Sequence, residues 1–247
     1  MRSGRFTGTG AVVAALVGGI VLSSLLAAPA PAAEAGKVKT LLLVGGTIHD
    51  WKGIGDVLEG YLKKSGKFDV TRVDQDLNAL LADRVAPYDL VVFYWTVGKI
   101  GDDQRNGLLD HIAKGKGFVT LHSGADSFRG DLAWRKFVGG HFIGHPRYRM
   151  YHVSMIKTEH PIIAGIKEYL TTDEQYFLDY SYSKDLTILA NGLHEGKLMP
   201  VIWTKPWKKG RVFYFAQGHD ARACKQPMVK KIFLRGCLWA AQRKVVD

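Results

Sequence analysis

The sequence is poor in cysteine, and this shortage limits the chemistry that the protein can carry. Only Cys224 and Cys237 occur among 247 residues. Their spacing matches no cysteine-rich zinc motif, so that kind of site is excluded. The two thiols could pair in an exported protein. However, Cys237 falls in an apolar helical pattern, where a cysteine commonly packs as a small buried residue, so the sequence leaves a disulfide open.

Nucleotide-binding motifs and long basic stripes are missing as well. Neither a Gly-x-Gly-x-x-Gly pattern nor P-loop spacing follows the glycine pair at Gly45 and Gly46. The formal net charge is +11, but the lysines are scattered or paired rather than gathered with aromatic residues. This distribution favours a solvated basic surface, so we expect no nucleic-acid partner.

The first 33 residues differ from the rest of the chain. Arg2 and Arg5 precede an uncharged apolar run over residues 11–28, and a zone of alanine and proline follows to residue 33. This order is typical of a secretory signal peptide over residues 1–33. A retained anchor is the alternative, because the run is close to the roughly 18 residues needed to span a bilayer. We therefore expect an exported protein, periplasmic or extracellular, with no membrane partner after cleavage.

The next part of the chain alternates between apolar strands and helical periodicity. Strand-like runs at 38–44, 68–73, 90–94 and 118–121 are separated by segments with helical spacing. Such alternation predicts right-handed crossovers and a mostly parallel sheet. Further strands are expected at 151–156, 186–190, 199–203 and 211–215, and an amphipathic helix at 227–243. The sequence thus predicts an α/β sandwich with helices on both faces, as one domain over residues 38–243.

Three histidines directly follow predicted strands. His49 follows the first strand, His122 the fourth, and His219 the strand that ends at Phe215. Because parallel strands end at one edge of a sheet, these imidazoles should meet there. Histidine is both the most common general base near neutral pH and the most common metal ligand. We therefore expect a functional pocket around these side chains.

Other polar residues are expected to complete this pocket. The segment Gly139–Pro146 contains too many glycines for a helix, so it should form a tight loop that brings His145 over the strand ends. Glu174 and Asp220 are carboxylates that could orient an imidazole, bind a metal or transfer protons, although a solvated loop is the plainer interpretation of Glu174.

The turn after the fourth strand resembles a nucleophile elbow, with His122 at its apex. Ser123 could act there as a nucleophile with His219 as its base, although it lies one position past the apex. A serine hydrolase is therefore one alternative for this protein.

Several stretches together resemble the ThuA-like (trehalose-utilisation) family of the class I glutamine amidotransferase-like superfamily. They are Gly46–Trp51, Gly117–Gly124, Val138–Pro146, His160–Gly165, Asp173–Tyr176 and Gly210–Asp220. The resemblance implies a flavodoxin-like, three-layer fold. True amidotransferases have a cysteine at the elbow, and His122 stands in its place here, so glutaminase activity should be absent. His219 occupies the position of the triad histidine of those enzymes.

The family's association with sugar catabolism implies a small-molecule carbohydrate as partner, with 3-keto-glycosides as the substrate class. We expect lyase, hydrolase or isomerase chemistry at a histidine-rich site, assisted by a divalent metal such as Zn²⁺ or Mn²⁺. The expected catalytic residues are His122, His219, Asp220 and Glu174. The expected metal ligands are His49, His122, His145 and His219. The expected substrate-binding residues are Asp50, Trp51, Trp95 and Ser123.

The main alternative is a non-catalytic carbohydrate-binding domain, in which tryptophans stack on sugar rings. The residues considered for this role are Trp51, Trp95, Trp134, Trp203 and Trp207. The sequence does not determine the oligomeric state.

Overall fold

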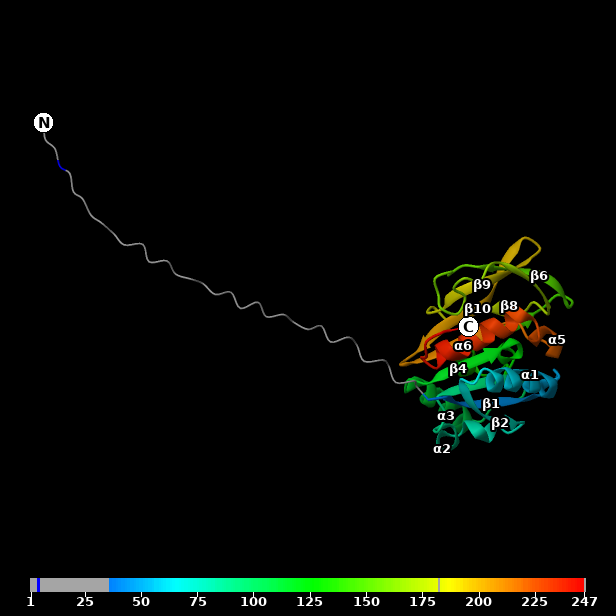
Figure 1. Cartoon of the computed structure of the whole chain (residues 1–247). Coiled ribbons are helices and arrows are strands. Elements are labelled where there is room, and N and C mark those ends of the chain that lie inside the picture. The colour runs from blue at the N-terminus through cyan, green and yellow to red at the C-terminus, as the bar shows by residue number, and fades with distance from the viewer. Residues whose placement is uncertain (1–3, 5–35, 182, 247) are drawn as a thin grey trace. The chain divides into compact units, whose positions relative to one another are not determined.

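The computed structural model describes Gly4 and residues 36–181 and 183–246 (Figure 1). The unit Gly36–Asp247 contains every helix and strand. Apart from Gly4, the expected signal peptide lies outside the described residues. Among the described helices, none is long and apolar enough to cross a membrane.

One half of the main sheet is parallel, with strand order β2-β1-β3-β4-β11. Its strands are β1 (Val38–Gly46), β2 (Phe68–Asp74), β3 (Leu90–Thr96), β4 (Gly117–Leu121) and β11 (Gly210–Phe215). Every residue of β3 and β4 is buried. This is why these strands appear in the sequence as continuous apolar runs rather than as alternating patterns.

The other half of the sheet continues from β11 as antiparallel strands in the order β10-β9-β6-β7. These strands are β10 (Lys197–Trp207), β9 (Thr187–His194), β6 (Arg149–Met155) and β7 (Tyr169–Asp173). On β6, Tyr151 and Val153 are buried, whereas Met150 is exposed. A small second sheet pairs β5 (His141–Gly144) with β8 (Phe177–Asp179).

Helices cover both faces of the parallel half. They are α1 (Trp51–Lys64), α2 (Ala82–Val85), α3 (Asp102–Ala113), α4 (Leu132–Val138), α5 (Ala221–Cys224) and α6 (Pro227–Ala240), with 3₁₀ turns η1 (Leu77–Leu80) and η2 (His122–Ala125). Phe118 on β4 packs on Phe137 of α4, whereas Phe213 on β11 lies against Gly236 of α6. Phe213 is in register with Val119, so the two phenylalanines point to opposite faces of the sheet. Helices α1 and α6 lie side by side in Figure 1.

The predicted α/β architecture is therefore confirmed, as a three-layer sandwich whose sheet has an antiparallel extension. The prediction of a loop at the segment containing His141 was wrong, because residues 141–144 form β5 and pair with β8. Nothing in the sequence pattern predicted α4, β7 or β8. Both Cys224 and Cys237 are buried free thiols.

The turn between β4 and η2 has the sharp geometry of an elbow. His122 has a φ of 37°, in the left-handed region that non-glycine residues rarely adopt. A Cβ at Gly124 would collide with Oγ1 of Thr120, so only glycine allows the chain to turn back so closely. The hydroxyl of Tyr214 donates to the His122 carbonyl at 3.0 Å and helps to hold the turn. The imidazole at the apex is thereby fixed at the end of β4.

Candidate functional site

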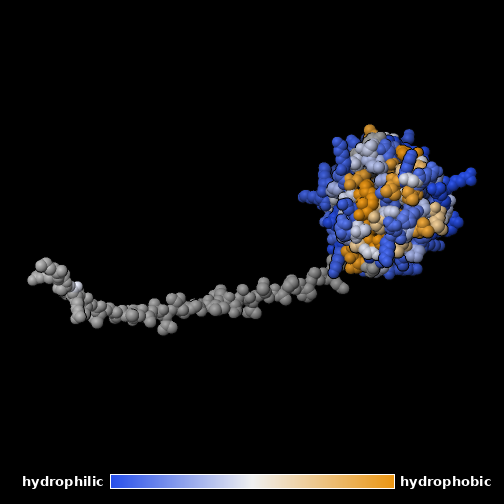
Figure 2. Space-filling model, turned by 90° about the horizontal axis from the view of Figure 1, so that it is seen from above, coloured by the Kyte–Doolittle hydropathy of each residue, from blue (hydrophilic) through white to orange (hydrophobic). Residues whose placement is uncertain are grey.

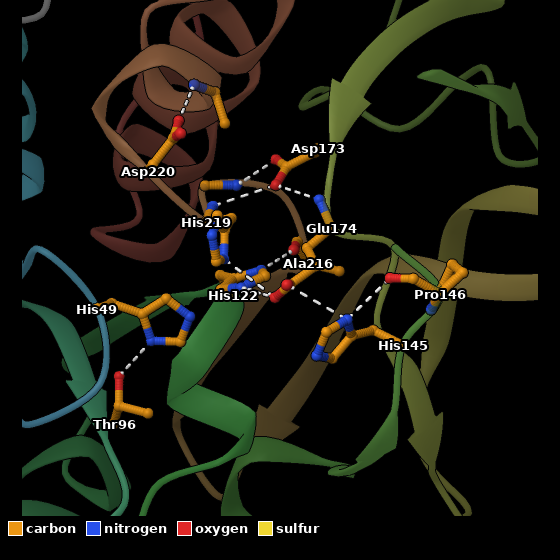
Figure 3. Close-up of polar contacts among 12 residues, drawn as sticks. His49, Thr96, His122, His145, Pro146, Asp173, Glu174, Ala216, His219 and Asp220 are labelled. Atoms are coloured by element: carbon orange, nitrogen blue, oxygen red, sulfur yellow. Dashed lines mark hydrogen bonds and ion pairs between the residues drawn. The ribbon is translucent and has the colours of Figure 1, made fainter. Parts of the chain in front are cut away.

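The side chains of His49, His122, Glu174 and His219 converge in one cluster (Figure 3). Each offers one potential ligand atom, and these atoms all lie within 4.8 Å of one another. The three imidazole rings are 5.0 to 5.3 Å apart, centroid to centroid. The histidines follow β1, β4 and β11, and Glu174 follows β7. The expected meeting of three strand-end imidazoles thus has a physical location at the carboxyl edge of the parallel strands.

His122 lies at the bottom of the cluster and has no exposed surface. Its Nδ1 lies 2.8 Å from the Ala216 carbonyl oxygen. Because a carbonyl can only accept, Nδ1 is the protonated nitrogen and Nε2 has a free lone pair. Nε2 is buried without a hydrogen-bond partner and lies 3.6 Å from Oε2 of Glu174. A buried nitrogen lone pair of this kind is suited to a metal ion.

His49 is oriented by a second contact of the same type. Its Nδ1 lies 2.7 Å from Oγ1 of Thr96 at the end of β3, which leaves Nε2 as the free nitrogen. Burial, together with the neighbouring His122 and His219 imidazoles, lowers the pKa of His49 to about 3. His49 is therefore neutral at ordinary pH, which is the form that binds metals.

His219 and Glu174 form the open side of the cluster. Nδ1 of His219 lies 3.0 Å from Oε2 of Glu174, but it is a buried atom without a well-aligned hydrogen bond. The contact with Glu174 raises the pKa of His219. Burial opposes ionisation of Glu174, but the hydrogen bonds and charges of His122 and His219 outweigh it and hold the pKa of Glu174 well below its ordinary value. The carboxylate is therefore ionised and could act as an anionic ligand.

His145 lies beside the cluster rather than within it. Its Nδ1 is 3.3 Å from Oε1 of Glu174 and 2.8 Å from the Pro146 carbonyl oxygen. Its side chain is 35% exposed, and it is not part of the four-residue ligand group. The structure thus puts Glu174, rather than His145, with the three other expected ligands. His145 is instead placed to exchange protons with solvent or a bound molecule.

Asp220 has a structural partner that accounts for its position. It is the N-cap of α5, where Oδ1 accepts the Ala223 N–H at 2.7 Å, and its other oxygen pairs with exposed Arg222. Figure 3 shows this carboxylate directed toward α5 and away from the imidazoles. The expectation of a catalytic Asp220 therefore has no support from its geometry.

The expected substrate-binding residues are only partly placed for that role. Asp50 is exposed and caps α1, and Trp51 begins that helix and packs partly on the core. By contrast, Trp95 is only 7% exposed and Ser123 is fully buried. Both of these side chains point into the interior, because neighbouring residues of a strand or tight turn alternate between the two sides of the backbone. The expectation that they contact substrate is corrected accordingly.

Burial also weakens both alternatives to a histidine-based enzyme. Trp134 and Trp203 are among the most deeply buried side chains, so they cannot stack on a sugar. Trp207 packs against Phe137, and its indole N–H donates to the Leu109 carbonyl. A serine hydrolase would need an accessible hydroxyl, which the buried Ser123 does not provide.

The donor set in the cluster fits a divalent metal ion. It comprises three imidazole nitrogens and one carboxylate oxygen, a combination that Zn²⁺ and similar ions accept. The nitrogens of His122 and His219 that face the cluster are buried and lack hydrogen-bond partners. Unpaired buried polar atoms carry a free-energy cost, and a cation would supply the missing interaction. The contacts that Thr96 and Ala216 make behind the rings set the required tautomers.

The sequence matches the model of the ThuA family, described as trehalose utilisation, over residues 39–240, so the chain belongs to this family. A ThuA-like protein from Parabacteroides merdae is 22% identical and has a TM-score of 0.78, covering 85% of this chain and 92% of that one. For one from Bacteroides uniformis, the identity is 18%, the TM-score 0.69, and the coverage 87% and 95%.

A GMP synthase protein from Thermoplasma acidophilum matches at 12% identity with a TM-score of 0.56, covering 84% of this chain and 96% of that one. These likenesses show the amidotransferase-like fold alone. No curated protein matches the chain by sequence. Family membership supports a carbohydrate-related role for the protein.

Proposed function

We propose that this protein is an exported enzyme that acts on sugars or 3-keto-glycosides through a metal-assisted histidine site. The observation that carries the proposal is the convergence of three imidazoles and an ionised carboxylate, with two buried nitrogens lacking other partners. The carbohydrate class is supported by the ThuA family. Export is supported by the basic and apolar pattern of residues 1–33.

The proposed roles divide the side chains into ligands and a proton-transfer group. His49, His122, His219 and Glu174 would hold the divalent ion. When bound, it would supply a Lewis acid that stabilises negative charge on a substrate oxygen. With those four side chains occupied, His145 is the partly exposed imidazole left beside the site.

The chemistry of a 3-ketone suits such a group. The ketone acidifies the neighbouring C2–H, and His145 would accept that proton as general base. Departure of the C1 substituent and addition of water would then cleave the glycoside, whereas return of the proton to another carbon would give isomerisation. Glu174, 3.3 Å from Nδ1 of His145, would orient the imidazole and stabilise its charged form.

The test is turnover of 3-keto-glucosides by purified protein, with no metal, with Zn²⁺ and with Mn²⁺. We expect metal-dependent product formation. We also expect that His145→Gln retains the metal but loses turnover about 100-fold or more, as for loss of a general base. His152→Gln is the matched control, because His152 lies on β6 and pairs with Glu168 instead. Absence of turnover with every ion would discard the 3-keto-glycoside assignment.

A further inference from the structure

Asp173 is the buried neighbour of Glu174 at the end of β7, and it has no exposed surface. Its carboxylate accepts three backbone N–H groups. Oδ2 accepts from Gly218 at 2.7 Å, while Oδ1 accepts from His219 at 3.2 Å and from Glu174 at 2.7 Å. Figure 3 shows these bonds meeting behind the imidazole cluster.

The bonds tie together two segments that are far apart in the sheet. Glu174 follows β7, the edge strand of the antiparallel half, whereas His219 follows β11 of the parallel half. Strands β10, β9 and β6 lie between β11 and β7 in the strand order. One carboxylate therefore spans the seam across which two of the four candidate ligands must meet.

The backbone geometry on the β11 side depends on the same contact. Gly218 has a φ of +118°, a conformation that favours glycine, and its N–H points to Oδ2 of Asp173. The next residue, His219, also donates its N–H to Asp173, so the direction of its side chain is set by a fixed backbone. On the other side, the bond to the Glu174 N–H fixes the start of the loop from which that carboxylate projects.

We propose that Asp173 is a positioning residue that sets the separation of Nδ1 of His219 and Oε2 of Glu174 for one metal ion. This inference rests on the metal site proposed above. Asp173 itself does not touch the cluster centre, and its role is to hold two backbones that belong to different halves of the sheet. Residues that support metal ligands from behind commonly change metal affinity 10- to 100-fold when they are replaced.

The test compares Asp173→Asn with the unmodified protein in three measurements: Zn²⁺ affinity, the visible spectrum of the Co²⁺-loaded form, and hydrogen exchange of the Gly218 and His219 amides. The asparagine has the same shape but only one acceptor oxygen, and its NH₂ group would face an N–H donor. We expect a roughly 10- to 100-fold weaker Kd, an altered Co²⁺ spectrum and faster exchange of both amides.

Asp131→Asn is the matched control, because Asp131 also accepts a backbone N–H, from Trp134 at the start of α4. It is expected to lower stability without changing any of the three measurements at the site. Unchanged affinity, spectrum and exchange in Asp173→Asn would overturn the inference while leaving the metal site intact.

If the unmodified protein binds neither Zn²⁺ nor Co²⁺, the proposed metal function fails, and amide exchange in Asp173→Asn still decides whether Asp173 positions the two segments. If the variant does not fold, exchange in the unmodified protein gives the answer. Strong protection of the Gly218 and His219 amides supports the inference, and rapid exchange overturns it.

Discussion

The parallel and antiparallel halves of the sheet use their side chains differently. In the parallel half, β3 and β4 are buried on both faces, and histidines follow β1, β4 and β11. In the antiparallel half, one face of β6 and β7 is open, and Met150 and Leu170 are each 61% exposed. Figure 2, which views the molecule from the side where β6 and β9 lie in Figure 1, shows apolar patches among polar surface.

The difference shows how one site is built from two kinds of sheet. The parallel half supplies the three imidazoles from strand ends that must share an edge. The antiparallel half supplies the carboxylate through β7, whose end approaches β11 only because the sheet curves back on itself. Charge complementarity therefore arises at the seam: neutral or cationic rings on one side and an anion on the other.

The largest expected effect comes from removing the buried imidazole of the parallel half. His122→Asn should lower turnover of the carbohydrate substrate by about 1,000-fold or more, because both a ligand and its fixed geometry are lost. The equivalent change on the open face, His152→Asn, should leave turnover within about twofold. Steady-state kinetics on both variants checks this contrast, and equal losses in the two would contradict it.

Core packing should separate the halves almost as strongly. Phe118→Ala in β4 removes a fully buried ring that contacts Phe93, Trp134 and Phe137. We expect it to lower the free energy of unfolding by about 3–5 kcal/mol. Leu170→Ala in β7 removes an exposed side chain and should change it by no more than about 0.5 kcal/mol. Urea unfolding measures both values, and a large loss for Leu170→Ala would show that its open face is covered in solution.

The sequence was informative where one strand determines its own environment. Continuous apolar runs identified β1, β3 and β4, and the residues after them identified His49 and His122. Glu174 was ambiguous, because nothing local shows that β7 ends beside β11. That meeting depends on curvature of the whole sheet and on the Asp173 bridge. No sequence signal pointed to Asp173, because its partners are backbone groups.

Two further residues show why direction is harder to predict than position. Trp95 and Ser123 are each next to a residue of the site, but a shift of one position along a strand or elbow turns the side chain to the opposite side. Both therefore lie in the interior. Similarly, the glycine-rich segment around His141 has the composition of a loop, but its pairing with β8 makes it a strand.

The pH dependence of stability should reveal the buried imidazoles of the metal-free protein. The pKa of His49 is lowered to about 3 by burial and by its imidazole neighbours, whereas an unfolded histidine titrates near 6.5. The unfolded state thus binds a proton that folded His49 does not, and stability falls as the pH drops from about 6.5 toward 3.

His49→Gln should reduce this dependence, with the larger gain relative to the unmodified protein at pH 4.5 than at pH 7.5. Denaturant unfolding in the presence of a chelator measures the difference. The opposite slopes contributed by Glu174 and His219 are common to both proteins and cancel. An identical pH slope in the two would show that His49 is not buried as a neutral ring.

The smallest expected effect concerns Asp220. Asp220→Ala removes the N-cap of α5 and should cost about 1 kcal/mol of stability. Because the carboxylate faces α5, turnover should fall no more than a few-fold at a temperature where the variant is folded. Thermal unfolding and kinetics together check this. A loss of turnover as large as that expected for His145→Gln would restore Asp220 to the catalytic group.

Calorimetric titration of chelator-treated protein with Zn²⁺ and Mn²⁺ tests the central claim most directly. We predict one tight site per chain for at least one of the two ions, and its loss in a His122→Ala, Glu174→Ala double variant that still folds. Absence of binding in the unmodified protein, or unchanged binding in the double variant, would contradict a metal centre formed by these side chains.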